Sequence, residues 1–363
     1  MFKKFLYAYF LLSSIPLSAS QPIIATISVG ISPAGIAITP DSHFAYVANN
    51  NNDEIPGADT VSVLDLRTNT LIQTISDPSF NEPYTVTING AGSKAYITNS
   101  NSTTITIIDI PSNTVAGTID GFDGPSGMAI DPNTNLAYVN NYGGPEGVGS
   151  GNGTTVNVVD LSMNMIVGLP IIVGLAPASL AITSDGTFVY VINYVDGNPG
   201  TGTISIIRTG DNTVIGTIPG FSGPFSIAIG PGDNYAYITN FGSNNFSPVG
   251  TTMSVVDLET NMMSGIVRLG TQPSGLAITP NGRLAYVSNY NTLYLGPNFT
   301  DLTPGRGTVN IINIENNAIL PQVLVVGASP ANIAISPDGR RACVTNYIAN
   351  TVSVINIFDK MWL

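Results

Sequence analysis

The sequence contains few charged residues, a single cysteine and a single histidine. Charged residues make up 9% of the 363 residues, but hydrophobic residues reach 43%, which excludes an intrinsically disordered chain. The lone cysteine, Cys343, excludes an internal disulfide, and one cysteine with one histidine is too few for a zinc cluster. A formal net charge of −12 without any basic cluster disfavours nucleic acid as a partner.

Residues 1–20 have the organisation of a secretory signal peptide. The Lys3-Lys4 pair is followed by the apolar run Phe5–Ile15 and by small residues at a plausible cleavage site, Leu17–Ser20. We therefore expect residues 21–363 to be secreted, periplasmic or otherwise part of the cell envelope. An uncleaved membrane anchor is the alternative, although the apolar run is short for a bilayer, and no later stretch has transmembrane character.

A four-residue pattern, Tyr-Val-x-Asn or a close variant, recurs seven times along the chain. A proline stands thirteen residues before each copy, and this spacing does not vary. Such constancy predicts seven structural repeats. The copies begin at Tyr46, Tyr96, Tyr138, Tyr190, Tyr237, Tyr286 and Cys343, and the prolines are Pro33, Pro83, Pro125, Pro177, Pro224, Pro273 and Pro330.

Each repeat predicts four strands joined by polar turns. In the first repeat, one strand follows the proline as Gly35–Thr39, and the second ends in the four-residue pattern. The third and fourth, Val61–Leu64 and Leu71–Ile75, are rich in β-branched and aliphatic residues, and turn-forming residues such as Pro40-Asp41 separate the strands. The whole of residues 21–363 is therefore expected to form one all-β domain, a seven-bladed β-propeller of four-stranded antiparallel blades.

The two ends of the chain predict how the ring closes. The last repeat stops after its third strand, near Ile357, whereas Ile23–Ile27 matches the fourth-strand pattern before the first proline. We expect this N-terminal strand to complete the last blade, because two strand edges would otherwise be open.

These repeats resemble the YVTN β-propeller repeat family, which includes bacterial periplasmic propellers and archaeal surface-layer-type proteins. The resemblance covers the whole mature chain and implies the propeller fold. It implies several functions, because related propellers include lactonase-like hydrolases, the non-catalytic heavy chains of amine dehydrogenases, and members that bind or assemble.

Variation between the repeats is concentrated in one connection, from the pattern's Asn to the third strand. In an up-and-down blade these connections share a face with the loops that join successive blades, so the insertions should gather on one face of the disc. An aromatic residue follows the Asn in five repeats, and the longest connection adds two more rings. We predict a platform for a protein, peptide or glycan partner, while packing of each ring against a neighbouring loop is the alternative. The residues are Tyr142, Tyr194, Phe241, Tyr290 and Tyr347, with Tyr294 and Phe299 on the longest connection.

Other recurring or unusual residues have structural interpretations. The pattern's Asn is expected to hydrogen-bond nearby backbone groups, and the acid that ends the third strand (Asp65, Asp109, Asp160, Asp257) is expected to form a turn. His43 is interpreted as a solvated turn residue on the face opposite the long connections, and Cys343 as a buried, inert thiol.

Little in the sequence indicates catalysis, and no residue is assigned a catalytic role. Asp53, Glu54 and Asp59 could hold calcium, or they are solvated loop acids; no other cofactor is expected. The leading hypothesis is an exported, non-enzymatic binding or assembly module. The alternative is a lactonase-like or lyase-like metal-dependent enzyme acting at the mouth of the central channel. Small residues after most of the prolines favour the binding module, with Tyr84 and Phe225 as exceptions.

Overall fold

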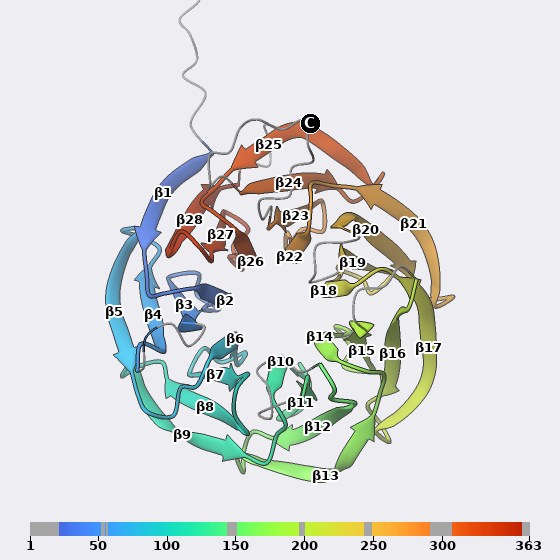
Figure 1. Cartoon of the computed structure of the whole chain (residues 1–363), viewed down its shortest axis with the longest axis horizontal. Coiled ribbons are helices and arrows are strands. Elements are labelled where there is room, and N and C mark those ends of the chain that lie inside the picture. The colour runs from blue at the N-terminus through green and yellow to red at the C-terminus, as the bar shows by residue number, and fades with distance from the viewer. Residues whose placement is uncertain are drawn as a thin grey trace, which may run out of the picture.

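A computed structural model of the chain describes residues 22–51, 55, 57–143, 151–195, 200–242, 249–290 and 307–357. The elements in these ranges are strands, arranged as seven four-stranded antiparallel sheets around a central axis (Figure 1). The protein is therefore an all-β, seven-bladed propeller, as its repeats predict. Within the described ranges, no helix has the length and apolar character needed to cross a membrane.

The strands follow the repeat without exception. Blade 1 contains β2 (Pro33–Ile38), β3 (Phe44–Asn49), β4 (Thr60–Asp65) and β5 (Thr70–Ser76), and blade 2 contains β6 (Pro83–Ile88), β7 (Lys94–Asn99), β8 (Thr104–Asp109) and β9 (Thr114–Asp120). Blade 3 contains β10 (Pro125–Ile130), β11 (Leu136–Asn141), β12 (Thr155–Asp160) and β13 (Met165–Ile172), and blade 4 contains β14 (Pro177–Ile182), β15 (Phe188–Asn193), β16 (Gly202–Arg208) and β17 (Thr213–Phe221). Blade 5 contains β18 (Pro224–Ile229), β19 (Tyr235–Gly242), β20 (Val249–Asp257) and β21 (Met262–Arg268), and blade 6 contains β22 (Pro273–Ile278), β23 (Leu284–Asn289), β24 (Thr308–Asn313) and β25 (Ala318–Val325). Blade 7 contains β26 (Pro330–Ile335), β27 (Arg341–Asn346), β28 (Thr351–Asn356) and β1 (Ile23–Ser28).

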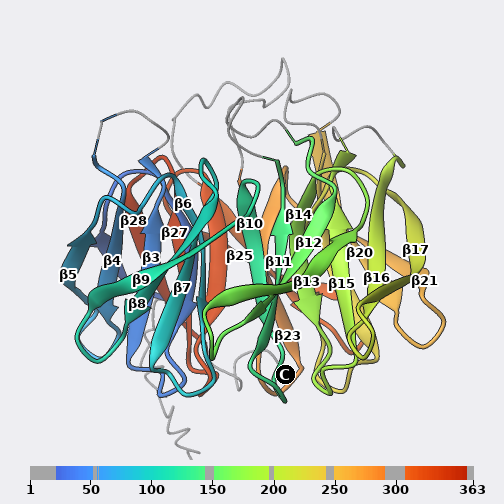
Figure 2. The same ribbon diagram turned by 90° about the horizontal axis from the view of Figure 1, so that it is seen from below.

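The first strand of each blade lies nearest the central axis and the last lies at the rim (Figure 1). Seen from the side, the strands run between the two faces of a disc (Figure 2). We call the face where the first strands begin and the second strands end the long-loop face; it carries the seven prolines and the seven pattern asparagines. The opposite face, with the turns between first and second strands, is the short-turn face.

The N-terminal strand belongs to the last blade. β1 pairs antiparallel with β28, with Ala25 opposite Val354 and Ile27 opposite Val352. Ile27 is only 6% exposed and packs in a cluster that also contains Ile36 and Val47 of blade 1. The two ends of the described chain are thus held in one sheet.

The core lies between neighbouring blades. Tyr46, Val61 and Val63 of blade 1, for example, pack against Ile97 and Ile108 of blade 2, and equivalent clusters recur around the ring. The second and third strands of a blade are buried on both faces, which explains why their sequences are apolar without strict alternation. The rim strands are more exposed, with a single buried residue each in β5, β9 and β21, because only one of their faces meets a neighbour.

The pattern's Asn bridges the second and third strands of its own blade. Its amide Nδ2 donates to the hydroxyl of a threonine in the third strand and to a polar side chain two residues further on. The sequence predicted that this Asn would bond to nearby backbone groups, but its partners are mainly side chains. Among the described residues, backbone contacts occur at Asn99 and Asn141, which also accept from the backbone N–H groups of Asn81 and Asp123. The bridges are Asn49 to Thr60 and Ser62, Asn99 to Thr104 and Thr106, Asn141 to Thr155 and Asn157, Asn193 to Thr203 and Ser205, Asn240 to Thr252 and Ser254, Asn289 to Thr308 and Asn310, and Asn346 to Thr351 and Ser353.

The variable position of the pattern often joins one blade to the next. The side chains of Thr98, Thr239 and Thr345 donate to carbonyl oxygens of the next blade's innermost strand, at 3.1, 2.9 and 2.8 Å. Asn140 donates in the same way to the carbonyl of Pro177. These bonds hold the inner strands together around the axis.

The pattern's Tyr makes a second link between blades, on the short-turn face. Its hydroxyl reaches the turn between the third and fourth strands of the next blade, where Tyr138 donates to Asn212 at 2.8 Å and Tyr190 donates to Asn261 at 3.0 Å. Both accepting asparagines have φ between 54° and 56°, the left-handed region that Asn tolerates well in turns.

Blade 7 has Cys343 in place of this Tyr, and Arg341 replaces the missing link. Its guanidinium donates to Asn69 of blade 1 at 2.9 Å. Cys343 itself is fully buried, as predicted, and burial raises the pKa of its thiol to about 12, which disfavours the reactive thiolate. The prediction for the third-strand acids is confirmed too, since Asp65 accepts from the backbone N–H of Arg67 and Asp160 from that of Ser162, each at 2.8 Å.

The Asn bridge should be a large contributor to blade stability. Asn240→Ala removes two buried hydrogen bonds and leaves a void, so we expect a loss of about 2 kcal/mol in the free energy of unfolding, measured by urea denaturation. Asn234→Ala, at an exposed turn position of the same blade, is the matched control and should change it by less than about 0.5 kcal/mol. Equal effects would contradict the structural importance of the bridge.

Removal of the N-terminal strand should open blade 7. Deleting residues 21–29 exposes the edge of β28 and uncovers the apolar cluster around Ile36. We expect aggregation, or a fall in melting temperature of at least about 10 °C, because loss of a whole strand removes several kcal/mol. A soluble, truncated protein with unchanged melting by circular dichroism would show that β1 is dispensable.

Candidate functional site

The long-loop face is organised by a left-handed residue before each proline. These seven residues have φ between 49° and 57° although only two of them are glycines. The left-handed conformation directs the carbonyl of each residue toward the second strand. There it accepts a hydrogen bond from the backbone N–H of the residue that follows the pattern's Asn. The donor and acceptor pairs are Asn50 and Ser32, Ser100 and Glu82, Tyr142 and Gly124, Tyr194 and Ala176, Phe241 and Gly223, Tyr290 and Gln272, and Tyr347 and Ser329, at 2.8 to 3.1 Å. The repeat itself therefore fixes the backbone of the five predicted aromatic residues that directly follow the pattern's Asn.

A cavity of about 440 Å³ opens where the innermost strands converge on this face. Small residues line much of it, including Ala34, Ala178, Ser274 and Ala331, the residues that directly follow four of the prolines. Five aromatic rings complete the wall, and we call them the mouth rings: Tyr84, Phe225, Phe241, Tyr290 and Tyr347. No charged side chain is among the described residues that line the cavity.

Four of the mouth rings form a continuous row. The ring centroids of Phe225 and Phe241 are 5.2 Å apart, those of Phe241 and Tyr290 are 6.0 Å apart, and those of Tyr290 and Tyr347 are 6.3 Å apart. Interplanar angles of 31° to 57° indicate tilted packing, which suits the aromatic quadrupoles. The row covers blades 5 to 7 and presents one curved aromatic surface to the cavity.

Tyr84 of blade 2 supplies the fifth ring from another part of the wall. Burial raises the pKa of its phenol well above 10, and the neighbouring phenols of Tyr142, Tyr347, Tyr290 and Tyr194 raise it further. Tyr84 comes from blade 2, yet it lines the same cavity as Tyr290 of blade 6 and Tyr347 of blade 7. The mouth is therefore crowded with neutral phenols.

The structure distributes the predicted aromatic residues over different environments. Phe241, Tyr290 and Tyr347 line the cavity, whereas Tyr142 is half-buried and outside its lining. Tyr194 is only 3% exposed and donates its hydroxyl to the carbonyl of Gly242 at 2.7 Å, so it packs against the next blade. Tyr294 and Phe299 lie outside the described residues.

Two mouth rings, Tyr84 and Phe225, are not among the aromatic residues predicted for the platform. Each directly follows a proline, where the other repeats have Ala or Ser. Blade 2, which has Ser100 where five of the blades carry the predicted ring, contributes Tyr84 to the cavity. This departure from the repeat was the signal in the sequence that could have identified Tyr84 and Phe225 as site residues. By itself, however, it does not indicate that their side chains face a cavity.

Acidic and metal-ligating residues do not converge at the mouth in the described part of the chain. Asp59 accepts from the backbone N–H of Glu82 at 3.3 Å, while Asp53 and Glu54, the other calcium candidates, lie outside the described residues. The described residues contain no group of three or more His, Cys, Asp or Glu placed to hold a metal ion. His43 is exposed, with Nδ1 3.2 Å from Asp41 Oδ2 in a turn of the short-turn face.

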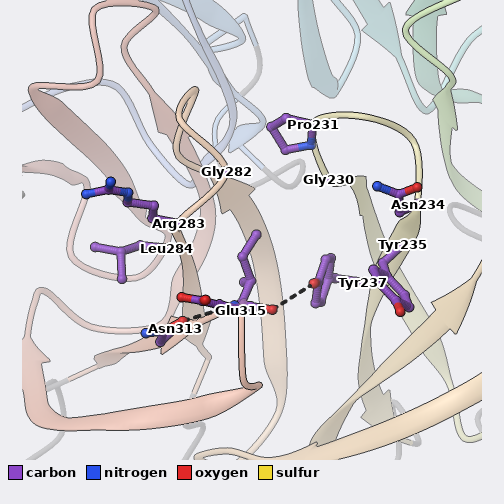
Figure 3. Close-up of a pocket in the computed structure, with 11 residues that line it drawn as sticks. Gly230, Pro231, Asn234, Tyr235, Tyr237, Gly282, Arg283, Leu284, Asn313 and Glu315 are labelled. Carbon is purple, nitrogen blue, oxygen red and sulfur yellow. Dashed lines mark hydrogen bonds between the residues drawn. The ribbon is translucent and has the colours of Figure 1, made fainter.

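A second cavity, of about 450 Å³, lies on the short-turn face between blades 5 and 6 (Figure 3). In Figure 3, Pro231, Tyr235 and Tyr237 lie on one side and the Gly282–Leu284 segment lies on the other, with the Tyr237 hydroxyl bonded to the Ile314 carbonyl at 3.5 Å. A third cavity between blades 1 and 2 is lined by residues from the same positions of the repeat. This recurrence indicates a gap that the blade geometry generates, whereas the mouth cavity depends on residues that break the repeat.

Comparisons with known proteins agree on the architecture. No protein-family model matches the chain. A segment of 112 residues is 34% identical to the seven-bladed beta-propeller protein Rv1057 of Mycobacterium tuberculosis, covering 30% of this chain and 26% of that protein. A segment of 63 residues is 46% identical to the PE-PGRS family protein PE_PGRS18 of the same organism, covering 17% of this chain and 14% of that protein.

Among solved structures, hydrazine synthase of Kuenenia stuttgartiensis aligns with a TM-score of 0.73 over 96% of this chain and 99% of that chain. The sequence identity is 17%, so this likeness establishes the fold and nothing about activity. The matched segments of the two mycobacterial proteins are also short relative to their full lengths.

The phenols at the mouth should make stability fall in alkaline solution. Burial, reinforced by Tyr347, raises the pKa of Tyr290 to about 12 from an ordinary value of 10, although a hydrogen bond with Ser329 opposes the shift. Because the unfolded chain loses this proton more easily, the stabilising contribution is complete below pH 10 and disappears as pH rises through 12. Urea unfolding across this range should show a shallower decline for Tyr290→Phe; an identical decline would contradict the assignment.

Proposed function

We propose that this protein is an exported, non-enzymatic binding module that holds a protein, peptide or glycan partner on its long-loop face. The observation that carries the proposal is the uncharged cavity of about 440 Å³ at the channel mouth, walled by five aromatic rings. Its volume is in the range of sites that accept small ligands or a protruding group of a larger partner. The seven copies of the Tyr-Val-x-Asn pattern, close variants included, support a place among the YVTN-type propellers.

Aromatic residues in a partly enclosed site are effective anchors. Tyr and Phe bury a large area with few rotatable bonds, so little conformational entropy is lost when they contact a partner. The row from Phe225 to Tyr347 is ordered by ring contacts before any partner arrives, which reduces the cost of binding further. Affinity should therefore be concentrated in the mouth rings, with the surrounding connections supplying specificity.

The alternative, a lactonase-like or lyase-like metal-dependent enzyme, needs groups that the described lining does not supply. A metal at the mouth would require carboxylates or imidazoles, and general acid–base chemistry would require a titratable group near neutral pH. The described lining offers phenols whose pKa values are raised, together with Ser, Thr, Asn and aliphatic residues. We therefore place binding first. Turnover of a lactone panel that chelation abolishes would reverse this order.

Export is part of the proposal and rests on residues 1–20. The signal-peptide pattern and the low charge content suit a periplasmic or secreted protein. A chain with one cysteine also tolerates an oxidising compartment, because it cannot form a wrong internal disulfide. The formal net charge of −12 favours a partner that is neutral or basic over a polyanion. Calcium held by Asp53, Glu54 and Asp59 remains an additional proposal, tested by calcium titration.

Replacement of mouth rings should separate binding from stability. A partner is first identified by pull-down from envelope extracts or on glycan arrays. The double variant Tyr290→Ala with Tyr347→Ala should then weaken the binding free energy of that partner by at least about 2 kcal/mol. Tyr194→Ala should instead lower the melting temperature, because that ring is buried and hydrogen-bonded to blade 5. Tyr235→Ala, 43% exposed on the opposite face, is the control and should alter neither. Binding that survives the double change would refute the channel mouth as the contact site.

A further inference from the structure

Most of the floor of the mouth cavity comes from one position of the repeat, the second residue after each proline, and the aliphatic side chains of Met128 and Leu180, one residue further along their strands, complete it. In blades 1, 3 and 6 this residue is glycine, namely Gly35, Gly127 and Gly275. In blades 2, 4, 5 and 7 it is a small polar residue, namely Thr85, Ser179, Ser226 and Asn332. All seven line the cavity.

The glycines allow the inner strands to approach one another. A Cβ on Gly35 would lie 2.3 Å from the carbonyl oxygen of Tyr84, and one on Gly275 would lie 2.6 Å from the Cα of Asn332. Because real Cβ atoms do not come this close, any side chain there would push neighbouring inner strands apart. The glycines therefore have a packing reason that is independent of any ligand.

The four polar residues of the floor have no comparable structural role. Within the described ranges, the hydroxyls of Thr85, Ser179 and Ser226 form no hydrogen bond, although their backbone groups are paired. Asn332 uses only its Oδ1, which accepts from the backbone N–H of Ile333 at 2.7 Å, and its Nδ2 is left to donate. All four side chains are half-buried at the cavity surface. They form a set of neutral donors and acceptors that the fold itself does not use.

The combination of floor and wall limits the chemistry of a ligand. A purely apolar group would bury the floor hydroxyls and the Asn332 amide without partners, which costs free energy for each one. An ion would find no opposite charge in the described lining. A quaternary ammonium group needs rings arranged around it, whereas Phe225 and Phe241 pack against each other at 5.2 Å.

We propose that the channel mouth binds a neutral saccharide, with the apolar face of a sugar ring against the row from Phe241 to Tyr347 and its hydroxyls on the polar floor. A sugar presents both kinds of surface, C–H groups on its faces and hydroxyls at its edge, and carries no charge. The phenol of Tyr84 adds a donor from the wall of blade 2. This inference rests on the proposed function, and it names the ligand class of that same site.

The test uses the full-length mature protein and a panel of neutral methyl glycosides and disaccharides, with binding followed by isothermal titration calorimetry and saturation-transfer NMR. Tyr347→Ala should reduce sugar affinity at least about tenfold, because it removes part of the stacking surface. Ser226→Ala and Asn332→Ala should each reduce it about threefold or more through a lost hydrogen bond. Tyr235→Ala on the short-turn face is the matched control and should bind as the wild type does. Circular dichroism verifies that each variant is folded.

The outcomes separate this inference from the proposed function. Sugar binding that depends on the floor and wall residues and is insensitive to salt supports the inference. If no saccharide binds, while an envelope protein or peptide still requires Tyr290 and Tyr347, the saccharide inference is wrong and the binding module stands. Tighter binding of tetramethylammonium chloride than of any sugar would also overturn it, in favour of a cation. If the mouth variants change the binding of no ligand in these assays, both proposals fail.

Discussion

The asparagine bridge between the second and third strands is the interaction on which the rest of this propeller depends. In every blade its amide joins two hydroxyl or amide groups of the next strand in a site shielded from water, where an unmade hydrogen bond is costly. In six of the seven blades the bridging Asn is also the last residue of the second strand. The next residue then donates its N–H to the left-handed residue before the proline, and in five blades that next residue carries an aromatic ring. The asparagine that stabilises each blade therefore lies directly beside the residue that carries the ring.

Contacts between blades are also made by residues of the four-residue pattern. The pattern's Tyr joins a blade to the next on the short-turn face, and the pattern's variable residue, where it is Thr or Asn, does so beside the axis. Where the repeat changes, the fold compensates: Cys343 cannot form the Tyr contact, and Arg341 reaches Asn69 instead. Tyr84 and Phe225 also depart from the repeat, but they replace small residues at the cavity and compensate for no missing contact. Departures without a structural reason are where function is best sought.

The chemistry of the mouth follows from what the innermost strands can accommodate. Close approach of neighbouring strands requires glycine at Gly35 and Gly275, so larger polar residues occur only where there is more room. Phenols crowded near the axis remain protonated because burial disfavours the phenolate. A neutral, partly polar and strongly aromatic pocket results at the centre of a protein whose net charge is −12. This pocket is the observation on which the proposed binding function rests.

The sequence alone determined the number of blades, the order of strands and the face on which variation gathers. These properties depend on local signals, namely strand propensity, turn residues and a constant spacing between the proline and the four-residue pattern, which repeat seven times and so reinforce one another. Only the tertiary structure decided which rings face the cavity. Tyr194 and Tyr347 occupy the same position of the pattern, yet one is buried against Gly242 and the other lines the mouth. Their environments differ because each ring packs against whatever the neighbouring blade presents, and no local pattern encodes that neighbour. For the same reason Tyr84 and Phe225 joined the site only when the seven inner strands were brought together around one axis.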